Sequence, residues 1–326
     1  MKVIEYNAIG NPVDVLEVKD VPSRAPGEGE VRVTVLATPI HPSNLLQISG
    51  QYGTGAAPKF PINPGAEGVG QVVEVGAGVG HLKVGQNVLL TGVGGTWREE
   101  ITAPAKAFIP VPPGDTEQLA MAVINPLTAH LLLSEIKTLK EGDWIMQSAA
   151  NSAVGEYLIQ LAAQRGIRTI NIVRRGDLEP KLKALGATVV LTDGPDLAER
   201  ARAACDGADI VYGVDSVGGA TFTRMVESLA PGATVAAYGV LAMEMPQLDL
   251  MSVIFRDIRV QGFWLAKWFE VAAPEAKQAA FGAIIPMIAG GTIKSAVDSR
   301  FKLEDIRDAV ARAAAPNRDG KVLLTP

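Results

Sequence analysis

The segment from Gly142 to Arg175 constrains the fold more than any other part of the chain. An apolar run begins at Trp144, small residues fill the positions from Ser148 to Ala153, and a second apolar run covers Thr169 to Val173. This order predicts a strand, a tight turn, a helix and a parallel strand, the unit from which doubly wound sheets are built. Small residues let the backbone approach a pyrophosphate, and a helix N-terminus attracts an anion. The segment therefore predicts a dinucleotide site.

The turn of this unit keeps only the last glycine of the pattern G-x-G-x-x-G. That glycine is Gly155, which we expect where the helix packs closely on the sheet. Ser152, Ala153 and Val154 fill the neighbouring positions and are expected to contact the cofactor. A single remaining glycine is a weak motif. The alternative is a βαβ unit of another kind of doubly wound protein.

Two arginines select the form of the dinucleotide. Arg174 and Arg175 follow the second strand, where an NAD site carries a carboxylate that binds the ribose 2′-hydroxyl. Guanidinium groups suit a 2′-phosphate instead. The sequence therefore predicts NADPH as the cofactor, unless the two arginines only lie on a solvated edge.

Composition excludes several classes of protein. A chain of 326 residues is long enough for two domains. The formal charge of −5 gives no basic patch for nucleic acid and no reason to expect binding to an anionic membrane. No apolar run is long enough to span a membrane. Cys205 is the only cysteine, which excludes an internal disulfide, and no targeting segment is recognised at the start of the sequence, so we expect a cytoplasmic protein.

The pattern of apolar residues changes twice along the chain. Residues 1–120 contain short alternating runs, at 30–38, 69–77 and 84–92, which predict an antiparallel, barrel-like domain. Residues 121–263 alternate strands with helices and predict a parallel sheet of six strands. Their expected bounds after the first strand are strands at 169–173, 188–191, 209–214, 234–238 and 258–263, with helices at 177–185, 195–204 and 219–229. Residues 264–326 are expected to return to the first domain, through helices at 274–289 and 303–314 and strands at 299–303 and 321–324.

Ligands of such sheets bind beyond the carboxyl ends of the strands. That rule places Ser148, Arg174, Asp215 and Gly239 around one crevice, with Tyr238 directly before the glycine. Tyr238 and Gly239 are therefore expected to contact the cofactor.

Four stretches carry a resemblance to a known family. They are GQNV at 85–88, NPLTAH at 125–130, the βαβ unit, and GKVLL at 320–324. Together they resemble the zinc-independent members of the medium-chain dehydrogenase/reductase superfamily. The resemblance implies an α/β fold, with a Rossmann-type doubly wound parallel sheet and a GroES-like, mostly antiparallel β-barrel catalytic domain.

Three stretches narrow the resemblance to mitochondrial-type trans-2-enoyl-thioester reductases. They are HPSNLLQISGQYG at 41–53, NPLTAH followed by 147–162, and MSVIFRDIRVQGFWLAKW at 251–268. Quinone oxidoreductases of the same superfamily share much of this pattern. Both activities therefore remain open at this point.

The residues do not suit the zinc site of the alcohol dehydrogenases in this superfamily. In those enzymes a cysteine of the first domain and a histidine beside a glutamate bind the metal. Here Ala66 precedes Glu67, and the first domain contains no cysteine. His41, His81 and His130 are too scattered in sequence to suggest a metal site. We therefore expect no zinc.

Without a metal, reduction of an activated C=C bond needs another group to stabilise the enolate oxygen and to supply a proton. A phenol can donate a hydrogen bond and then a proton at neutral pH. Tyr52, between Gly50 and Gly53, is the candidate, and the resemblance implies this catalytic role. The alternative is that Tyr52 only packs in a glycine-rich loop.

Aromatic residues after the last predicted strand of the sheet form a second candidate group. The resemblance implies that Trp264 contributes to catalysis by lining the acyl pocket, and that Phe263 and Trp264 contact the cofactor. Trp268 is a further candidate for the pocket. The alternative for the tryptophans is a core or an interface between chains.

Polar residues outside the turn complete the predicted site. The resemblance implies that Asn125 and Thr128 face the nicotinamide and the reacting carbons, although Asn125 before Pro126 also fits a helix N-cap. Asn44 is expected near the nicotinamide, at a position where relatives often carry an aspartate. Lys321 is expected to reach the cofactor or a thioester phosphate, unless it is a solvated strand end.

The leading hypothesis is NADPH-dependent reduction of an α,β-unsaturated small molecule, first of all a trans-2-enoyl thioester, by hydride transfer to the β-carbon. The alternatives are a quinone or alkenal reductase and a non-catalytic NADPH-binding protein. The resemblance also implies a homodimer, paired through the strands expected within 232–239 and 258–264. No nucleic acid or membrane partner is expected.

Overall fold

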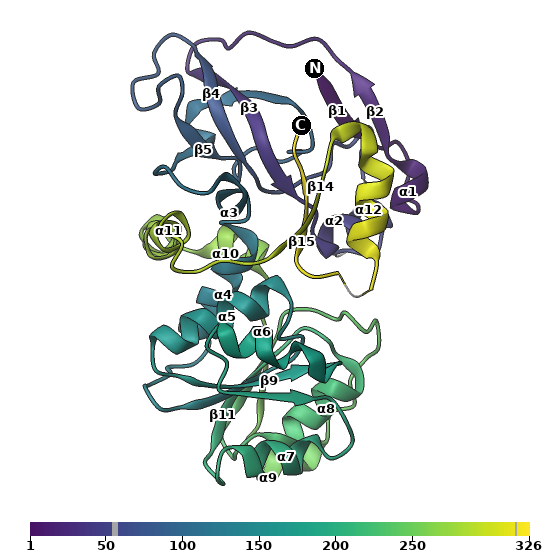
Figure 1. Cartoon of the computed structure of the whole chain (residues 1–326), viewed down its shortest axis with the longest axis vertical. Coiled ribbons are helices and arrows are strands. Elements are labelled where there is room, and N and C mark those ends of the chain that lie inside the picture. The colour runs from purple at the N-terminus through teal and green to yellow at the C-terminus, as the bar shows by residue number, and fades with distance from the viewer. Residues whose placement is uncertain (54–57, 317) are drawn as a thin grey trace. The chain divides into compact units, whose positions relative to one another are not determined.

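The computed structural model describes residues 1–53, 58–316 and 318–326 (Figure 1). They form two compact units, Met1–Ile124 with Gly282–Pro326 and Asn125–Phe281. The sequence pattern places its boundaries after residues 120 and 263 and assigns the first unit to catalysis and the second to the cofactor. That functional division stays a prediction.

The first unit is built on antiparallel strands. Its strands are β1 (Lys2–Glu5), β2 (Glu17–Asp20), β3 (Glu30–Pro39), β4 (Val69–Val75), β5 (Asn87–Leu89), β6 (Glu100–Pro104), β7 (Ile109–Pro110), β14 (Val297–Phe301) and β15 (Lys321–Leu324). β1 pairs with β2, and a larger sheet follows the order β14-β15-β3-β4-β5-β7, with β6 also paired to β3. Among the described residues of this unit, only the pair β14 and β15 is parallel. This arrangement is the expected barrel-like, mostly antiparallel domain.

β3 shows why the alternating runs form this sheet. Val31, Val33 and Val35 point into the core, while Arg32 and Thr34 between them are partly exposed. The run at 84–92 forms a shorter strand than predicted, because a turn with Gly85 at φ 85° precedes Asn87.

Short helices complete the first unit. They are α1 (Pro12–Val15), α2 (Pro42–Ile48), η1 (Ala105–Ala107), α3 (Thr116–Ala120), η3 (Leu303–Asp305) and α12 (Ile306–Ala314). α12 buries Ile306, Ala309, Val310 and Ala313, which recur at helical spacing along one face. That face packs into the cluster that also contains Trp97.

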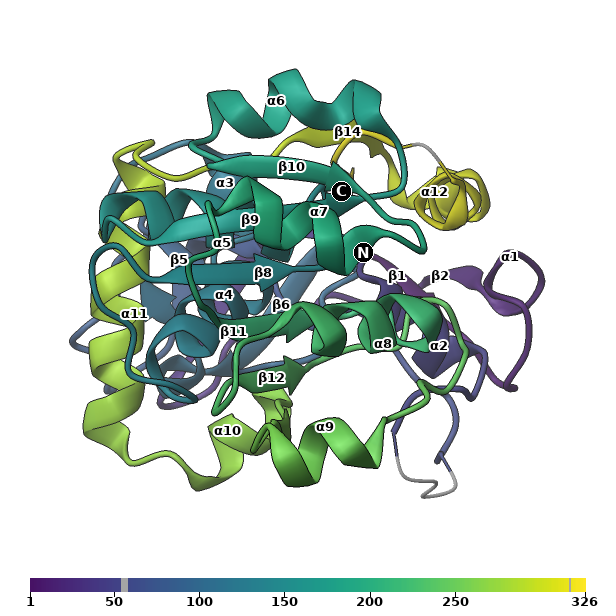
Figure 2. The same cartoon turned by 90° about the horizontal axis from the view of Figure 1, so that it is seen from below.

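The second unit is the predicted parallel sheet. Its strands are β8 (Trp144–Gln147), β9 (Arg168–Val173), β10 (Val189–Thr192), β11 (Ile210–Asp215), β12 (Thr234–Ala237) and β13 (Arg259–Gly262). Their order is β10-β9-β8-β11-β12-β13, with every pair parallel, and Figure 2 shows β10 to β12 in succession. Successive strands are added outward from β8 toward β10 and then outward from β11 toward β13. The strand order therefore reverses between β8 and β11, which is where ligands bind in such folds.

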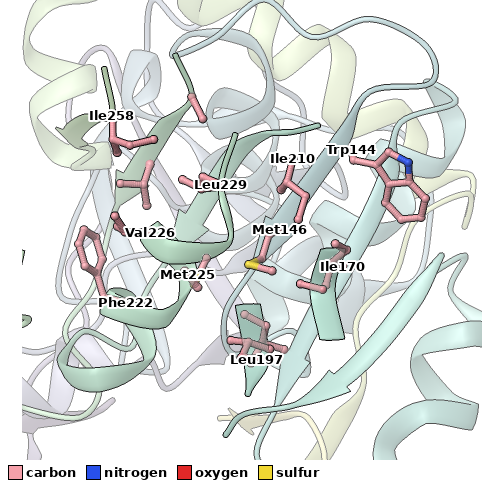
Figure 3. Close-up of a cluster of buried hydrophobic side chains, with 14 of the residues drawn as sticks. Trp144, Met146, Ile170, Leu197, Ile210, Phe222, Met225, Val226, Leu229 and Ile258 are labelled. Carbon is pink, nitrogen blue, oxygen red and sulfur yellow. The ribbon is translucent and has the colours of Figure 1, made fainter. Parts of the chain in front are cut away.

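Helices alternate with these strands. They are α4 (Ile124–Ser134), α5 (Ala153–Gln164), η2 (Gly176–Leu178), α6 (Glu179–Ala184), α7 (Leu197–Ala204), α8 (Gly219–Ser228) and α9 (Leu250–Phe255). After the last strand come α10 (Leu265–Val271) and α11 (Pro274–Ala289), and the residues of α11 from Gly282 onward belong to the first unit. Figure 3 shows part of the core, where Met146 and Ile170 of the sheet meet Leu197 and Phe222 of the helices. Cys205 is buried in this cluster as a small apolar residue. In the described ranges no helix combines the length and the apolar character that crossing a membrane requires.

Candidate functional site

The turn after β8 has the close packing that the sequence predicts at Gly155. A Cβ atom on Gly155 would lie 2.5 Å from the carbonyl oxygen of Ala150, so a larger residue cannot occupy this position without movement of the backbone. Ser152 is the N-cap of α5, and its Oγ accepts a hydrogen bond of 3.1 Å from the N–H of Gly155. Ala153 and Val154 form the first turn of α5, where backbone N–H groups have no partner within the helix.

A second contact joins the ends of β8 and β11, where the strand order reverses. Ser148 Oγ donates a hydrogen bond of 2.6 Å to Asp215 Oδ1 and accepts one of 3.0 Å from the N–H of Ser216. Asp215 Oδ2 also accepts from the N–H of Gly218 at 2.8 Å. Burial raises the pKa of Asp215, while these hydrogen bonds oppose the shift. Ser148 and Asp215 therefore lie together, as the sequence predicts.

The loop after β12 lies against the same strand end. The N–H of Tyr238 donates to the carbonyl oxygen of Asp215 at 2.9 Å. A Cβ atom on Gly239 would lie 3.0 Å from the carbonyl oxygen of Ser216, which favours glycine there. Burial raises the pKa of the Tyr238 phenol to about 12, so this hydroxyl stays protonated at neutral pH.

Arg174 and Arg175 follow β9 directly, and both side chains are exposed. Arg175 Nε lies 3.6 Å from Asp177 Oδ1, and both partners of this pair are in contact with solvent. Exposed pairs of this kind are weak. Arg174 and Arg175 can therefore bind an anion in place of solvent, and Arg175 would give up only a weak ion pair with Asp177.

Tyr52 lies in the first unit, four residues after the end of α2. Gly50 and Gly53 on either side have φ values of 72° and 84°, a conformation that favours glycine. The side chain of Tyr52 is 37% exposed. Residues 54–57, which follow this turn, lie outside the described ranges.

The aromatic candidates differ in their surroundings. Phe263 continues the ladder of β13, since its N–H donates to the carbonyl oxygen of Ala237 at 2.9 Å. Trp264 is 45% exposed at the start of α10. Trp268 packs edge-on against Phe269, with ring centroids 5.3 Å apart. This contact favours a packing role for Trp268.

Asn125 and Thr128 are both buried in α4. The helix begins at Ile124, so Asn125 lies inside its first turn and the interpretation as an N-cap is wrong. Glu67 instead accepts hydrogen bonds from the N–H groups of Val123 and Ile124, at 2.9 and 2.8 Å. Within the described ranges Asn125 Nδ2 has no hydrogen-bond partner, so it can donate to a ligand.

Asn44 is buried near the start of α2. Its Oδ1 accepts a hydrogen bond of 2.9 Å from the backbone N–H of His41. Over the part of the chain that the structure describes, Asn44 Nδ2 lacks a partner. A neutral amide thus stabilises this helix start as an aspartate would.

A buried row of polar side chains was missed in the sequence. His41 Nε2 lies 2.6 Å from Glu67 Oε1, and Lys321 Nζ lies 3.0 Å from His41 Nδ1. Lys321 is only 5% exposed, so its interpretation as a solvated strand end is wrong. The separation of 280 residues between Lys321 and His41 hid the contact. The one sequence signal was the presence of a charged residue in each of the otherwise uncharged stretches PGAEGVG and GKVLL.

The row does not amount to a metal site. Across residues 1–53, 58–316 and 318–326, no three His, Cys, Asp or Glu side chains are grouped as ligands of an ion would be. Ala66, beside Glu67, has no donor atom in its side chain.

Comparison with known proteins gives two family matches. Residues 27–113 match the alcohol dehydrogenase GroES-like domain, and residues 153–280 match the zinc-binding dehydrogenase family. The human mitochondrial enoyl-[acyl-carrier-protein] reductase is 34% identical over 335 residues, which covers 100% of this chain and 88% of the human protein.

Solved structures of two activities resemble the chain over its whole length. The complex of Etr1p with NADP and crotonyl-CoA is 27% identical, with a TM-score of 0.89, and covers 100% of this chain and 99% of that one. A mitochondrial Etr1p/Etr2p heterodimer from Candida tropicalis is 28% identical, with a TM-score of 0.88 and the same coverage. A mycobacterial quinone oxidoreductase is 30% identical, with a TM-score of 0.85, and covers 100% of both chains.

The comparisons correct the expected compartment. The human, rat and bovine relatives are all named as mitochondrial enzymes, which contradicts the cytoplasmic expectation. That expectation rested on the first residues of the sequence and on cysteine usage, and cysteine usage does not distinguish the cytosol from the mitochondrion.

Family membership follows from these matches together with the folds of both units. Relatives above 30% identity cover the complete chain, and the two domain families are those of the medium-chain reductases. The protein is an enzyme of the reductase type, and it belongs to the zinc-independent enoyl and quinone reductases of the medium-chain dehydrogenase/reductase superfamily.

Proposed function

We propose that this enzyme uses NADPH to reduce the C=C bond of a trans-2-enoyl thioester. The observation that carries the proposal is the identity of 34% with a human enoyl-[acyl-carrier-protein] reductase along the whole chain. The complex of Etr1p with NADP and crotonyl-CoA supports the same cofactor and substrate class.

The turn after β8 fits a dinucleotide. Gly155 lets the backbone of Ala150 pack closely on the first turn of α5, and α5 directs its N-terminal N–H groups and positive dipole end toward the turn. Arg174 and Arg175 would bind the 2′-phosphate. The other residues that we assign to the cofactor are Asn44, Thr128, Ser152, Ala153, Val154, Tyr238, Gly239, Phe263, Trp264 and Lys321.

When bound, the coenzyme supplies a hydride from nicotinamide C4 to the β-carbon of the substrate. The electron pair of the C=C bond then moves toward the α-carbon and the thioester oxygen. Tyr52 would stabilise the enolate oxygen with its phenol and provide the proton that reaches the α-carbon. Asn125 Nδ2, a buried donor without a partner among the described residues, suits the carboxamide or the substrate oxygen. Trp264 would line the acyl pocket.

The second candidate is reduction of a quinone or an alkenal. The mycobacterial quinone oxidoreductase, at 30% identity over the whole chain, supports it. A quinone oxygen can take protons from solvent, so this reaction does not need Tyr52.

A panel of acceptors separates these activities. NADPH oxidation, followed by absorbance, is measured with crotonyl-CoA, longer enoyl-CoAs, simple enones and quinones. The proposal expects the highest kcat/KM with an enoyl thioester. A higher value with a quinone would favour the second candidate, and binding of NADPH without turnover of any acceptor would indicate a non-catalytic protein.

We also propose a homodimer that pairs through β13. This strand is at the edge of its sheet, and Val260 within it is exposed. An exposed edge strand is a template for pairing with a second chain. The Etr1p/Etr2p heterodimer supports assembly of related chains in pairs. Light scattering in solution should give twice the mass of the chain, and a monomer at micromolar concentration would contradict this assignment.

A further inference from the structure

Three charged or titratable side chains form a buried row in the first unit. Glu67 lies before β4, His41 precedes α2, and Lys321 begins β15. All three are less than one-tenth exposed. We refer to Glu67, His41 and Lys321 as the buried row.

The chemistry of the groups fixes the direction of each hydrogen bond. Glu67 Oε2 accepts from two backbone N–H groups, and an ionised carboxylate can only accept. His41 Nε2 must therefore carry the proton that it shares with Glu67 Oε1 at 2.6 Å. His41 Nδ1 is then an acceptor, and the ammonium of Lys321 donates to it at 3.0 Å. Glu67 thus selects the one neutral tautomer of His41 that can receive Lys321.

The row also balances charge inside the core. A buried carboxylate and a buried ammonium are each costly without compensation. The imidazole joins the two and remains neutral itself. Burial is the main cause that lowers the pKa of His41, the charges of Lys321 and Arg318 add to the shift, and Glu67 opposes it. The neutral ring is therefore the form present at neutral pH.

We propose that Glu67 and His41 are positioning residues that hold the Lys321 ammonium in place for an anionic group of the phosphorylated coenzyme. The contact with His41 fixes the direction of one of the three N–H groups of this ammonium. A buried ion pair contributes little net stability. A gain in stability therefore does not explain the presence of Glu67, His41 and Lys321 in the core. The proposal rests on the proposed function, which assigns Lys321 to NADPH.

The row itself can be tested without ligand or activity. The chain has three histidines, so a ¹⁵N-histidine NMR spectrum contains three imidazoles, which H41Q, H81Q and H130Q assign. At pH 7.5 we expect His41 to be protonated at Nε2 and to accept at Nδ1. The Nδ1 resonance should shift in K321M, and the single tautomer should be lost in E67Q. Nδ1 protonation in the wild type, or no response to K321M, would overturn the proposal.

Coenzyme binding tests the role of the row. NADPH fluorescence gives Kd between pH 5.5 and 8 for the wild type, K321M, H41Q and E67Q, with H81Q as the matched surface control. Loss of one charged hydrogen bond should weaken binding about ten- to a hundredfold in K321M, and H41Q and E67Q should follow it. A merely structural role would give additive effects. We expect the double variant H41Q/K321M to have the same Kd for NADPH as K321M alone, because His41 acts only through that lysine.

The pH dependence provides a further readout. Protonation of His41 at Nδ1 removes the acceptor for Lys321. Because burial lowers the pKa of His41, this loss begins only well below pH ~6.5, and there the wild-type affinity should fall more steeply than that of K321M or H41Q. The 2′-phosphate of the ligand titrates near pH 6, but it does so equally for every variant. The groups that face His41 are Glu67, Lys321 and Arg318.

The outcomes separate the two proposals. Normal binding in H41Q and E67Q beside weak binding in K321M would overturn the positioning role and leave the proposed function intact. If the wild type binds no NADPH, the proposed function fails, while the NMR result still decides the arrangement of the row. Circular dichroism of each variant confirms that it is folded.

Discussion

At the residue scale, the proposed chemistry depends most on one phenol. Tyr52 lies in a turn between two glycines and keeps part of its surface exposed, as a group that meets a substrate must. Tyr52→Phe removes the hydroxyl and keeps the ring. We expect kcat with an enoyl thioester to fall about 10²- to 10⁴-fold, the usual contribution of a positioned acid, with NADPH affinity unchanged.

The matched control for this change is Tyr6→Phe. Tyr6 is buried in the same unit, where burial raises the pKa of its phenol. Its replacement should leave kcat at the wild-type value. Equal activity of the Tyr52 and Tyr6 variants would remove Tyr52 from the mechanism.

Cofactor choice is also decided by single residues. Arg174→Ala combined with Arg175→Ala should raise the Kd for NADPH far more than the Kd for NADH, because only NADPH carries the 2′-phosphate. Arg168→Ala is the control on the same strand, where Arg168 lies over the ring of Trp144 at 5.6 Å. Fluorescence titration with both coenzymes measures the ratio, and equal weakening of the two would contradict the assignment.

Residue contacts mark the limit of what the sequence could predict. Ser148, Asp215 and Gly239 could be placed together because strand ends in a doubly wound sheet share one edge. The contact between His41 and Lys321 could not, because it joins residues 280 positions apart through a fold whose details no local pattern contains. The local pattern also predicted Asn125 as the N-cap of α4. The acceptor at that helix start is instead Glu67, which is 57 residues away in sequence and so could not be found from the local pattern.

At the element scale, the fold was predictable wherever an apolar run repeats with a regular period. The expected strand at 169–173 is observed as β9, Arg168–Val173, and the last expected strand is β15 without any change of bounds. Short elements were not predicted, such as α9 and α10, because six or seven residues give too little periodicity. The helical conformation of α9 and α10 depends on contacts with residues distant in sequence.

Gly155 links the turn after β8 to α5, and a methyl group there should disturb both. Gly155→Ala puts a Cβ atom 2.5 Å from the carbonyl oxygen of Ala150. We expect the free energy of unfolding of this unit to fall by about 1–3 kcal/mol, together with weaker NADPH binding. Thermal melting and fluorescence titration measure the two effects.

Gly282→Ala is the control for this prediction. Gly282 lies within α11, and a Cβ atom there would meet nothing within 4 Å. Alanine is the better helix former by about 1 kcal/mol, so this variant should be at least as stable as the wild type. A destabilising Gly282→Ala beside a neutral Gly155→Ala would reverse the packing argument.

At the scale of the whole molecule, each unit contains one histidine whose pKa is lowered. Burial is the main cause for both, with Lys321 adding to it at His41 and Arg165 at His130. In the unfolded chain both rings titrate near pH ~6.5. The folded protein keeps them neutral to lower pH, so below that value the unfolded chain binds protons that the folded chain does not.

Stability should therefore fall as the pH decreases below about 6.5, by up to about 1.4 kcal/mol per pH unit for each histidine, until the folded pKa is reached. Above that pH both rings are neutral in either state, and they add nothing to the slope.

The carboxylate of Asp298 affects stability in a lower range of pH than the two histidines do. Hydrogen bonds from Arg312 hold its pKa far below the usual range, so its contribution is lost only in stronger acid, below about pH 4.

The two histidines lie in different units, so their effects can be separated. Urea unfolding between pH 5 and 8 should show a smaller acid slope in H41Q for the unit built around β3, and in H130Q for the unit built around β8. Two resolved transitions would assign each slope directly, because units that unfold separately do not share one free energy of unfolding. If the wild-type slope below pH 6.5 persisted in the double variant, the protons would have to bind elsewhere, and the neutral state of His41 on which the buried row depends would lose its support.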